Sequence, residues 1–327
     1  MELSVIIPMY NAGKYIGECL ESLLNQTLKD FDVIVVDDCS TDNSRKVVQS
    51  FLESFGGRLK LKKLSKNSGC PGPPRNTALN MARGKYVYFL DADDLIAPDA
   101  LENLCAAAEN FDADVVHTEK YFTFRDGADN CKLTSYQTSE FVTVPTLETF
   151  DIGARVEGFT QKRFLWGAGG KFVRLKFLRD NKITFPAIKC WEDFVFSFQC
   201  LVAAKNYVRV PNVNYYYRLR DDSLSHELLD PVKFMEILIG VVKSADDFMS
   251  GRKFFEDNPQ YKFMVTDFFM QERITAFSGF FGKHDIGEIY NFLKGIFSRR
   301  TQDTAALTAY LFVAANILKI YTEELGG

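Results

Sequence analysis

The segment from residue 86 to residue 94 reads Tyr86-Val87-Tyr88-Phe89-Leu90-Asp91-Ala92-Asp93-Asp94. Its first five residues are apolar or aromatic without a break, which predicts a strand buried on both faces of a parallel sheet. Three carboxylates follow within four positions. We expect water to reach these carboxylates, because burying even one unpaired charge is costly. The segment therefore predicts a central strand with an acidic cluster at its carboxyl end.

The acidic cluster has two interpretations. If the backbone stays extended, Asp91 and Asp93 point to one side of the sheet and Asp94 points to the other. Two carboxylates on one side could hold a hard divalent cation, and ligands bind at this edge in open α/β sheets. The alternative is a solvated loop that supplies an acidic N-cap to a helix starting near Pro98. The motifs in the rest of the chain favour the first interpretation.

Length, charge and cysteine usage restrict the class of protein. The chain has 327 residues, which is longer than one typical domain, and its net charge of -4 gives no indication of a nucleic-acid partner. Its seven cysteines are scattered and form no CxxC pair, which is typical of a reducing compartment and predicts neither disulfides nor a zinc site. Strand-like sequence begins at Leu3 without a basic leader, and no apolar run reaches the ~20 residues of a membrane helix. We expect a cytoplasmic protein.

Strand-like and helix-like segments alternate before residue 90, which predicts a parallel sheet with right-handed crossovers. The weakest of these strands should lie at an edge, because lysines interrupt it. A loop rich in glycine and proline over residues 67–76 precedes the last helix. The expected strands cover 3–8, 32–37 and 59–64, and the expected helices cover 15–24, 47–55 and 77–82.

The remaining two thirds of the chain contains fewer strand-like segments. Residues 114–124 read as a strand, and residues 207–218 read as two short strands around Pro211. A helix should run from Trp191 to about Ala204, and helical periodicity dominates from residue 230 onward. We therefore expect an α/β domain that is followed by a helical C-terminal region.

Four motifs stand in the first third of the chain. They are Ser4-Val5-Ile6-Ile7-Pro8-Met9-Tyr10-Asn11, Val35-Val36-Asp37-Asp38-Cys39-Ser40-Thr41-Asp42, Asn67 through Arg75-Asn76, and Asp91-Ala92-Asp93-Asp94. In this order and spacing they resemble the family 2 glycosyltransferases, which are inverting enzymes of the GT-A fold that use nucleotide-sugar donors. The resemblance covers roughly the first 120 residues closely.

Other nucleotide-binding folds fit the sequence less well. No GxGxxG follows the first strand and no GxxxxGK[ST] occurs, so neither a Rossmann dinucleotide site nor a P-loop is supported. A sugar-phosphate nucleotidyltransferase would be expected to carry a glycine-rich basic loop where this chain has Met-Tyr-Asn-Ala-Gly. The family 2 resemblance remains the best explanation of the four motifs.

The resemblance implies three regions with different tasks. Residues 1–120 form the half of the GT-A domain that binds the nucleotide sugar, and residues 121–228 form the acceptor-side half. Residues 229–327 form a C-terminal helical region, where the apolar segment 305–321 is expected to serve oligomer formation or peripheral contact with the inner face of the membrane.

The resemblance also implies a donor site. Pro8 and Tyr10 would cradle the base, and Asp38 would accept a hydrogen bond from its edge, which suits the imide N–H of uracil; guanine is the alternative. Each of these residues also has a structural interpretation, since Pro8 could end a strand, Asp38 could cap a helix and Arg75 could be a surface charge. The implied donor-binding residues are Pro8, Tyr10, Asn11, Asp38, Asn67, Arg75, Asp91, Ala92 and Arg218.

Two sets of carboxylates would carry the chemistry. Asp93, helped by Asp91, would hold Mn²⁺ or Mg²⁺ on the diphosphate. The resemblance places the catalytic base in the pair Glu192-Asp193, and by its position we choose Asp193. Inverting transfer needs one carboxylate to take the proton of the acceptor hydroxyl, so the chemistry agrees. The alternative is that both acids only stabilise a helix N-terminus.

Two further positions lie close to these motifs. Residues 164–172 resemble the family's Trp-x-Lys-Leu region, with extra glycines that predict a mobile loop beside the acceptor site. Trp166 in this loop could be a platform for a sugar or a packing residue. His226 could contact a metal or a phosphate, but an exposed loop histidine is the simpler interpretation.

The sequence thus predicts a metal-assisted, inverting glycosyltransferase. It would move a sugar from a nucleotide-sugar donor, preferably UDP-linked, to a hydroxyl of a glycan or cell-surface polymer. The alternative is a catalytically silent relative that binds nucleotide or glycan. Loss of Asp93 or Asp193 would have favoured that alternative, and both residues are present.

Overall fold

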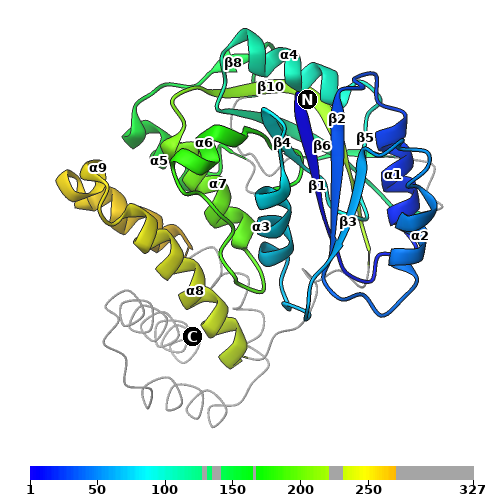
Figure 1. Ribbon diagram of the computed structural model, residues 1–327. Helices are drawn as coiled ribbons and strands as arrows, with labels where there is room; N and C mark the ends of the chain where they lie inside the picture. The colour runs from blue at the N-terminus through cyan, green and yellow to red at the C-terminus, as the bar shows by residue number, and fades with distance from the viewer. Residues whose placement is uncertain (127–130, 135–140, 165–166, 221–230, 270–327) are drawn as a thin grey trace, which may run out of the picture. The chain divides into compact units, whose positions relative to one another are not determined.

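The structure is a computed structural model that describes residues 1–126, 131–134, 141–164, 167–220 and 231–269 (Figure 1). The chain divides into two compact units, Met1–His226 and Glu227–Gly327. The assignment of donor and acceptor tasks to parts of the chain stays a prediction. Trp166, His226 and the segment 305–321 lie outside the described residues.

The first four long strands form the parallel part of the sheet in unit 1. They lie in the order β3-β2-β1-β4, which places the first and fourth strands side by side and confirms the predicted edge position of the third. Helices α1 (Ile16–Leu24) and α2 (Ser44–Ser50) cover one face of these strands, and α3 (Gly72–Met81) covers the other (Figure 1). The four strands are β1 (Leu3–Met9), β2 (Phe31–Asp37), β3 (Leu59–Lys63) and β4 (Tyr86–Phe89).

Pro8 ends the ladder between β1 and β4. The Leu90 N–H donates to the Ile6 carbonyl at 3.1 Å, and the next bond of this parallel ladder would need the N–H of residue 8. Proline has no N–H to donate. The two strands therefore stop pairing at this point, and the loops that follow them are free to diverge at the carboxyl edge of the sheet.

Helix α3 begins earlier than the sequence predicts. It starts at Gly72, inside the segment expected to be a loop, and Pro73 and Pro74 occupy its first turn. Proline is favoured there because the first N–H groups of a helix have no intrahelical partner and its φ already suits a helix. The early start places Arg75 on a buried helical turn instead of in a loop.

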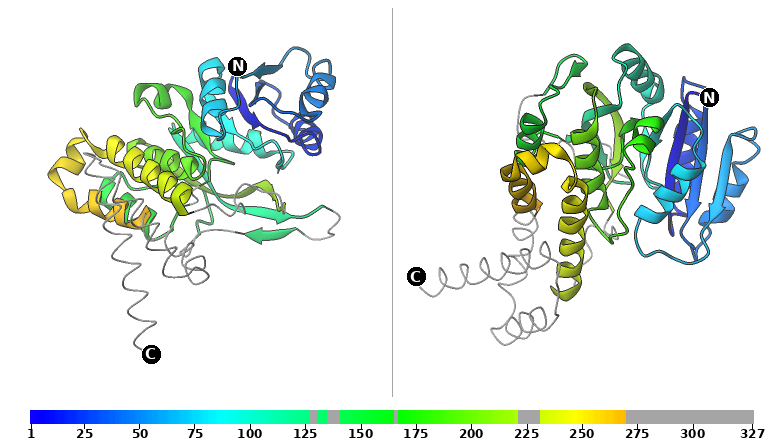
Figure 2. Two further views of the ribbon diagram at one scale, coloured as in Figure 1. Left: turned by 90° about the horizontal axis from the view of Figure 1, so that it is seen from below. Right: turned by 60° about the vertical axis from the view of Figure 1, so that its left-hand side comes forward.

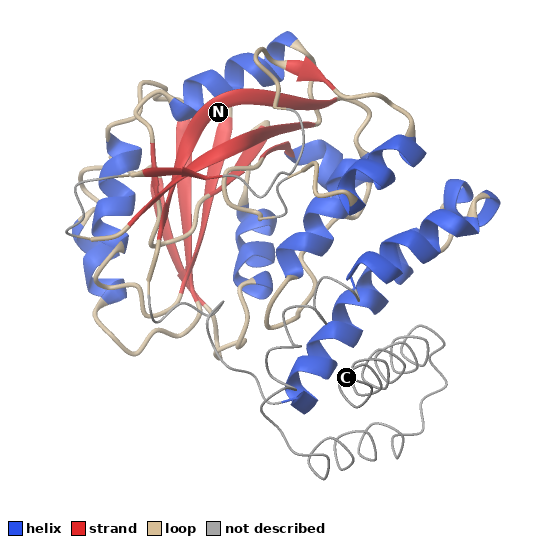
Figure 3. Cartoon of the chain, turned by 180° about the vertical axis from the view of Figure 1, so that it is seen from behind, coloured by secondary structure: helices blue, strands red, loops and turns tan. Residues whose placement is uncertain are grey.

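The second half of the sheet is mixed. Strand β9 (Phe172–Arg174) lies antiparallel between β4 and β6 (Val115–Phe124), and β6 is parallel to β10 (Tyr207–Arg218). Short strands β5 (Leu95–Ile96), β7 (Lys132–Thr134) and β8 (Thr146–Leu147) complete the sheet. Figure 3 shows the strands as one sheet with helices on both sides, and Figure 2 shows β6 and β7 extending beyond it.

The prediction of two strands around Pro211 was wrong. Strand β10 is continuous, but its register against β6 shifts between Val210 and Val213. A register shift of this kind is where a sheet tolerates proline, because no ladder hydrogen bond is required of that residue. The single strand carries the chain from Tyr207 to Arg218.

The helices of the second half and of unit 2 follow the predicted periodicity. Helix α7 begins at Glu192 and ends at Ala203, as expected. No helix in the described parts of the chain has both the length and the apolar character needed to cross a membrane. The helices are α4 (Ala100–Asn110), α5 (Ile152–Thr160), α6 (Leu175–Asp180) and α7 in unit 1, and α8 (Pro231–Met249) and α9 (Lys253–Asp257) in unit 2.

A buried arginine holds the carboxyl end of α7. The Arg155 guanidinium, on α5, donates to the carbonyls of Leu201 at 2.9 Å, Ala204, Lys205 at 3.2 Å and Thr149 at 2.6 Å. The last carbonyls of a helix have no intrahelical donor, and a cation at this end is also favoured by the helix dipole. Arg155 thereby fixes the helix whose first turn carries Glu192 and Asp193.

Arg155→Met should lower the free energy of unfolding by roughly 3 kcal/mol, because several buried carbonyls would lose their charged donor. The matched control is Lys176→Met, which removes only an exposed i,i+4 pair with Asp180 and should cost about 0.5 kcal/mol or less. Urea denaturation checks both values. Equal effects of the two variants would contradict a structural role for Arg155.

Candidate active site

The acidic segment forms a turn at the carboxyl end of β4. The Asp94 N–H donates to the Asp91 carbonyl at 3.1 Å, so the backbone forms a turn here and does not stay extended. Ala92, one of the expected donor-binding residues, is buried within this turn. Each of the three carboxylates in this turn has different partners.

Asp94 is buried and holds the turn to β10. Its carboxylate accepts hydrogen bonds from the Tyr215 hydroxyl at 2.6 Å and from the Arg218 N–H at 2.8 Å. Burial, with added repulsion from Asp93 and Asp91, raises the pKa of Asp94 well above its usual value. The expectation that water reaches all three carboxylates was therefore wrong for Asp94, because protein donors take the place of water.

Asp91 and Asp93 keep contact with solvent and are paired with arginines. Asp91 Oδ1 lies 2.7 Å from Arg75 Nη2, and Asp93 Oδ2 lies 2.7 Å from Arg220 Nε. The exposed fractions of the two carboxylate side chains are 32% and 20%. Arg220 was not among the predicted site residues, although its position two residues after Arg218, just past the end of a strand, was a usable signal.

The Asp91 and Asp93 carboxylates fit a divalent metal by their chemistry. Carboxylate oxygens are the ligands that Mg²⁺ and Mn²⁺ prefer, and Mg²⁺ commonly uses one or two carboxylates together with phosphate oxygens and water. Among the described residues, no three His, Cys, Asp or Glu side chains group together as a complete metal site. A metal here would therefore need oxygens from the donor or from water.

Arg75 connects the acidic turn with helix α7. Its Nη2 pairs with Asp91 at 2.7 Å and its Nη1 pairs with Glu192 Oε1 at 2.5 Å. Burial acts to lower the pKa of Arg75, but Asp91, Glu192 and Asp193 outweigh it and raise the pKa, so the guanidinium stays charged. The same guanidinium lies over the Phe185 ring at 5.2 Å. Arg75 is thus a buried bridge and not a surface charge.

The two acids at the start of α7 differ in accessibility. Glu192 is buried, and this burial together with Asp193 raises the pKa of Glu192 to about 8 against the opposing effect of Arg75. Asp193 is half-buried, and its Oδ1 accepts the Phe194 N–H at 3.0 Å. Trp191, just before them, has a left-handed φ of 68°, which is strained for a bulky residue and often marks a functional site.

The predicted base-binding residues lie in the loops after β1 and β2. The Asp38 carboxylate accepts hydrogen bonds from the Ser68 N–H at 2.8 Å and the Ser68 hydroxyl at 2.7 Å. The Asn67 side chain donates to the Asp38 carbonyl at 3.0 Å. Each carboxylate oxygen can accept a second hydrogen bond, so Asp38 retains capacity for a ligand. Tyr10 is 51% exposed at the end of β1.

Asn11 holds two of these loops together. Its backbone N–H donates to the Ser40 hydroxyl at 2.9 Å, and its side-chain oxygen accepts the Thr41 N–H at 2.8 Å. It adopts a left-handed φ of 48°, which asparagine tolerates better than most residues. The structure therefore gives Asn11 a role in shaping the loops, and its contact with a nucleotide stays a prediction. Ser68 was missed because its role depends on a contact 30 residues away in the sequence.

Arg218 lies beneath the acidic turn. Its Nε donates to the Asp93 carbonyl at 2.8 Å, its Nη2 pairs with Glu18 at 2.5 Å, and its Nη1 pairs with Asp126. The side chain is buried. Arg218 thus holds the backbone of the turn, whereas Arg220 pairs with the Asp93 carboxylate. The predicted contact of Arg218 with the donor remains a prediction.

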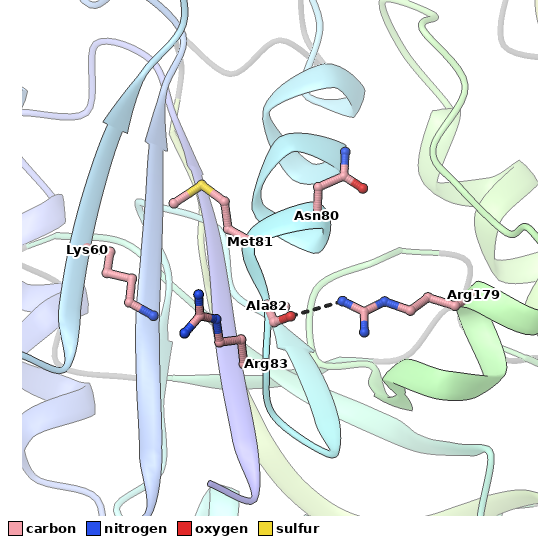
Figure 4. Close-up of a pocket in the computed structure, with 6 residues that line it drawn as sticks. All are labelled: Lys60, Asn80, Met81, Ala82, Arg83 and Arg179. Atoms are coloured by element: carbon pink, nitrogen blue, oxygen red, sulfur yellow. Dashed lines mark hydrogen bonds between the residues drawn. The ribbon is translucent and has the colours of Figure 1, made fainter.

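A pocket lies at the amino-terminal edge of the parallel strands, away from the acidic turn at their carboxyl edge (Figure 4). Its volume is about 570 Å³. Lys60 in its wall pairs with Asp32 at 2.6 Å, and Arg179 donates to the Ala82 carbonyl at 3.0 Å. It contains none of the predicted donor, metal or base residues. The lining residues are Lys60, Asn80, Met81, Ala82, Arg83 and Arg179.

Comparison with known proteins finds relatives that are named as glycosyltransferases. A poly(ribitol-phosphate) beta-glucosyltransferase of Bacillus spizizenii is 31% identical over 255 residues, covering 75% of this chain and 37% of the relative. The poly(ribitol-phosphate) beta-N-acetylglucosaminyltransferase TarS of Staphylococcus aureus is 31% identical over 243 residues, covering 73% of this chain and 39% of the relative. The chain thus spans less than two fifths of the length of either relative.

A solved structure supports the fold. The crystal structure of S. aureus TarS 1-349 in complex with UDP-GlcNAc matches with a TM-score of 0.71 and 27% sequence identity, covering 90% of this chain and 80% of that one. The family model described as glycosyl transferase family 2 matches residues 4–173, which is more than half of the 327 residues. The matched segment contains Pro8, Asp38, Arg75 and the acidic turn. The chain belongs to glycosyltransferase family 2.

Proposed function

We propose that this chain is an inverting glycosyltransferase that moves a sugar from a UDP-linked donor to a hydroxyl of a cell-surface polymer. Two sequence relatives are named for transfer to poly(ribitol-phosphate), and a similar solved structure contains UDP-GlcNAc. Those names and that ligand favour UDP over GDP as the nucleotide and a polymer over a small glycan as the acceptor.

The observation that carries the proposal is the position of Arg75. One buried guanidinium pairs with Asp91 in the acidic turn and with Glu192 at the start of α7. The carboxylates expected to hold the diphosphate are therefore close to the carboxylates expected to serve the acceptor. This proximity is what a direct transfer between donor and acceptor requires.

Several residues of the chain fit the binding of a uridine donor. Tyr10 is exposed where β1 ends and offers a ring for the base to stack on. Asp38 can accept the imide N–H of uracil in addition to its bonds from Ser68. Asp91 and Asp93 would hold Mn²⁺ or Mg²⁺, which when bound offsets negative charge on the diphosphate.

Asp193 fits the role of base better than Glu192. Glu192 is buried in its ion pair with Arg75, whereas Asp193 keeps contact with solvent. In the reaction, the acceptor oxygen bonds to the anomeric carbon from the face opposite the diphosphate, and the bond from that carbon to the diphosphate oxygen breaks. Asp193 takes the hydroxyl proton and UDP leaves, so the configuration inverts.

A catalytically silent relative is the second candidate. It would bind UDP through the same donor edge but would transfer no sugar. The presence of Asp93 and Asp193 favours the enzyme, and the measurements below separate the two candidates.

Asp193→Asn should lower the rate of sugar transfer by ~10²–10⁴, the usual contribution of a general base, while UDP-sugar affinity stays nearly unchanged. Glu192→Gln is the matched control and should slow transfer less, because its side chain is buried against Arg75. Steady-state kinetics and calorimetric titration with UDP-sugar measure the two quantities.

Three outcomes of this experiment would revise the proposal. If Glu192→Gln is the inactive variant and Asp193→Asn is active, the base is Glu192. If neither change slows transfer, the pair only stabilises the helix start. If the wild-type chain binds UDP and transfers to no polymer or glycan, the silent relative is correct.

Asp93→Asn should weaken metal-dependent UDP binding on the order of 10²-fold, because it removes one charged ligand while keeping the side-chain volume. The change in melting temperature on adding UDP, with and without Mn²⁺, measures this. Asp180→Asn, in an exposed pair with Lys176, is the control and should bind UDP normally. Full transfer activity in EDTA would show that the acidic turn is only structural.

A further inference from the structure

Lys171 is a buried lysine at the start of β9 that the proposed mechanism does not use. Its side chain is almost completely buried, and its Nζ donates to the Gly167 carbonyl at 2.5 Å. Its backbone N–H also donates, to the Ala168 carbonyl at 3.1 Å. A buried ammonium is costly unless it is hydrogen-bonded and faces opposite charge, so its surroundings are informative.

The segment that Lys171 holds lies next to Asp193. A Cβ atom placed on Gly167 would be 3.9 Å from Asp193 Oδ2. Asp193 also acts electrostatically on Lys171, as does Cys200. Asp193 and Cys200 are seven residues apart on α7, so they share one face of the helix. The Lys171 ammonium therefore faces the side of α7 that carries the proposed base.

We propose that Lys171 is a positioning residue for Asp193, because it fixes the Gly167 segment beside this carboxylate and supplies a positive charge that favours its ionised form. The proposal rests on the role of Asp193 as the base in the proposed function.

Other titratable and charged groups also surround Asp193 and Lys171. On the donor side, Asp193 faces Glu192 and the Arg75 guanidinium, which also pairs with Asp91. On the other side, His117 lies near Lys171. Burial first, and then Lys171 and Arg209, lower the pKa of His117 well below its usual value, so this histidine stays neutral. Lys171 is thus a second cation that acts on Asp193, besides Arg75.

The sign of the expected pH effect follows from these charges. Burial lowers the pKa of Lys171 to about 8 against the opposing effects of Cys200 and Asp193, so the ammonium is charged below that pH and neutral above it. A nearby positive charge lowers the pKa of a carboxyl group. Removing the Lys171 charge should therefore raise the pKa of Asp193 and move the acid limb of the activity profile to higher pH.

The first test compares pH profiles of kcat/KM for sugar transfer. Lys171→Gln keeps a hydrogen-bond donor without the charge, and Lys171→Met removes both. Both variants should move the acid limb upward by about one pH unit, a size typical for loss of one neighbouring charge. Arg155→Met is the matched control: it removes a buried cation at the far end of α7, so it should lower the melting temperature without moving the acid limb.

A second test does not depend on turnover. The carboxyl ¹³C resonance of Asp193, assigned by its loss in Asp193→Asn, is titrated in the wild-type chain and in Lys171→Gln. A higher apparent pKa in Lys171→Gln supports the proposal, and an unchanged value overturns it, as does an acid limb that stays fixed in both lysine variants. The apparent pKa of Asp193 could also be higher in Lys171→Gln than in the wild-type chain while the wild-type chain transfers no sugar. That result would overturn the proposed function and leave the electrostatic role of Lys171 supported.

Discussion

The ion pairs of Arg75 are the contacts on which the rest of the site depends. A buried guanidinium needs opposite charge close to it, and here Asp91 and Glu192 supply that charge to the two terminal nitrogens of Arg75 from two different elements. Asp91 belongs to the turn after β4, and Glu192 begins α7. A single side chain from α3 thus holds the acidic turn close to the start of α7, which carries the proposed base.

Other buried groups support this arrangement from outside it. Asp94 joins the acidic turn to β10 through Tyr215 and Arg218, so both halves of the sheet hold this turn. Arg155 holds the other end of α7. The residues proposed to meet substrate, Asp93 and Asp193, are more exposed than these supports. The site therefore combines buried, paired supports with more accessible carboxylates.

Hydrophobic periodicity was sufficient to predict most of the fold. The buried strands and their alternation with helices depend on patterns within a few residues, which a sequence displays directly. The start of α3 was missed because Gly72, Pro73 and Pro74 indicate a loop unless the tolerance of a first helical turn for proline is considered. The continuity of β10 was missed because a bulge accommodates Pro211.

The site was predictable in its residue types but not in its pairing. Motifs marked Asp91, Arg75 and Glu192, yet nothing within the sequence showed that one guanidinium would join the two carboxylates across a separation of 101 residues in the chain, from position 91 to position 192. Asp94 was expected to be solvated because its partner, Tyr215, comes from a distant strand. Contacts between distant segments are set by the tertiary fold, which local pattern does not encode.

A double-mutant cycle between Arg75 and Glu192, measured as the free energy of unfolding in urea, tests the bridge most directly. Arg75→Met alone should destabilise the chain by about 3–5 kcal/mol, because it leaves Glu192 buried without its partner. Glu192→Gln added to Arg75→Met should restore much of that loss, so that the two changes are coupled by at least about 2 kcal/mol. Additive effects of the two substitutions would contradict the claim that Arg75 holds the donor edge and α7 together through Glu192.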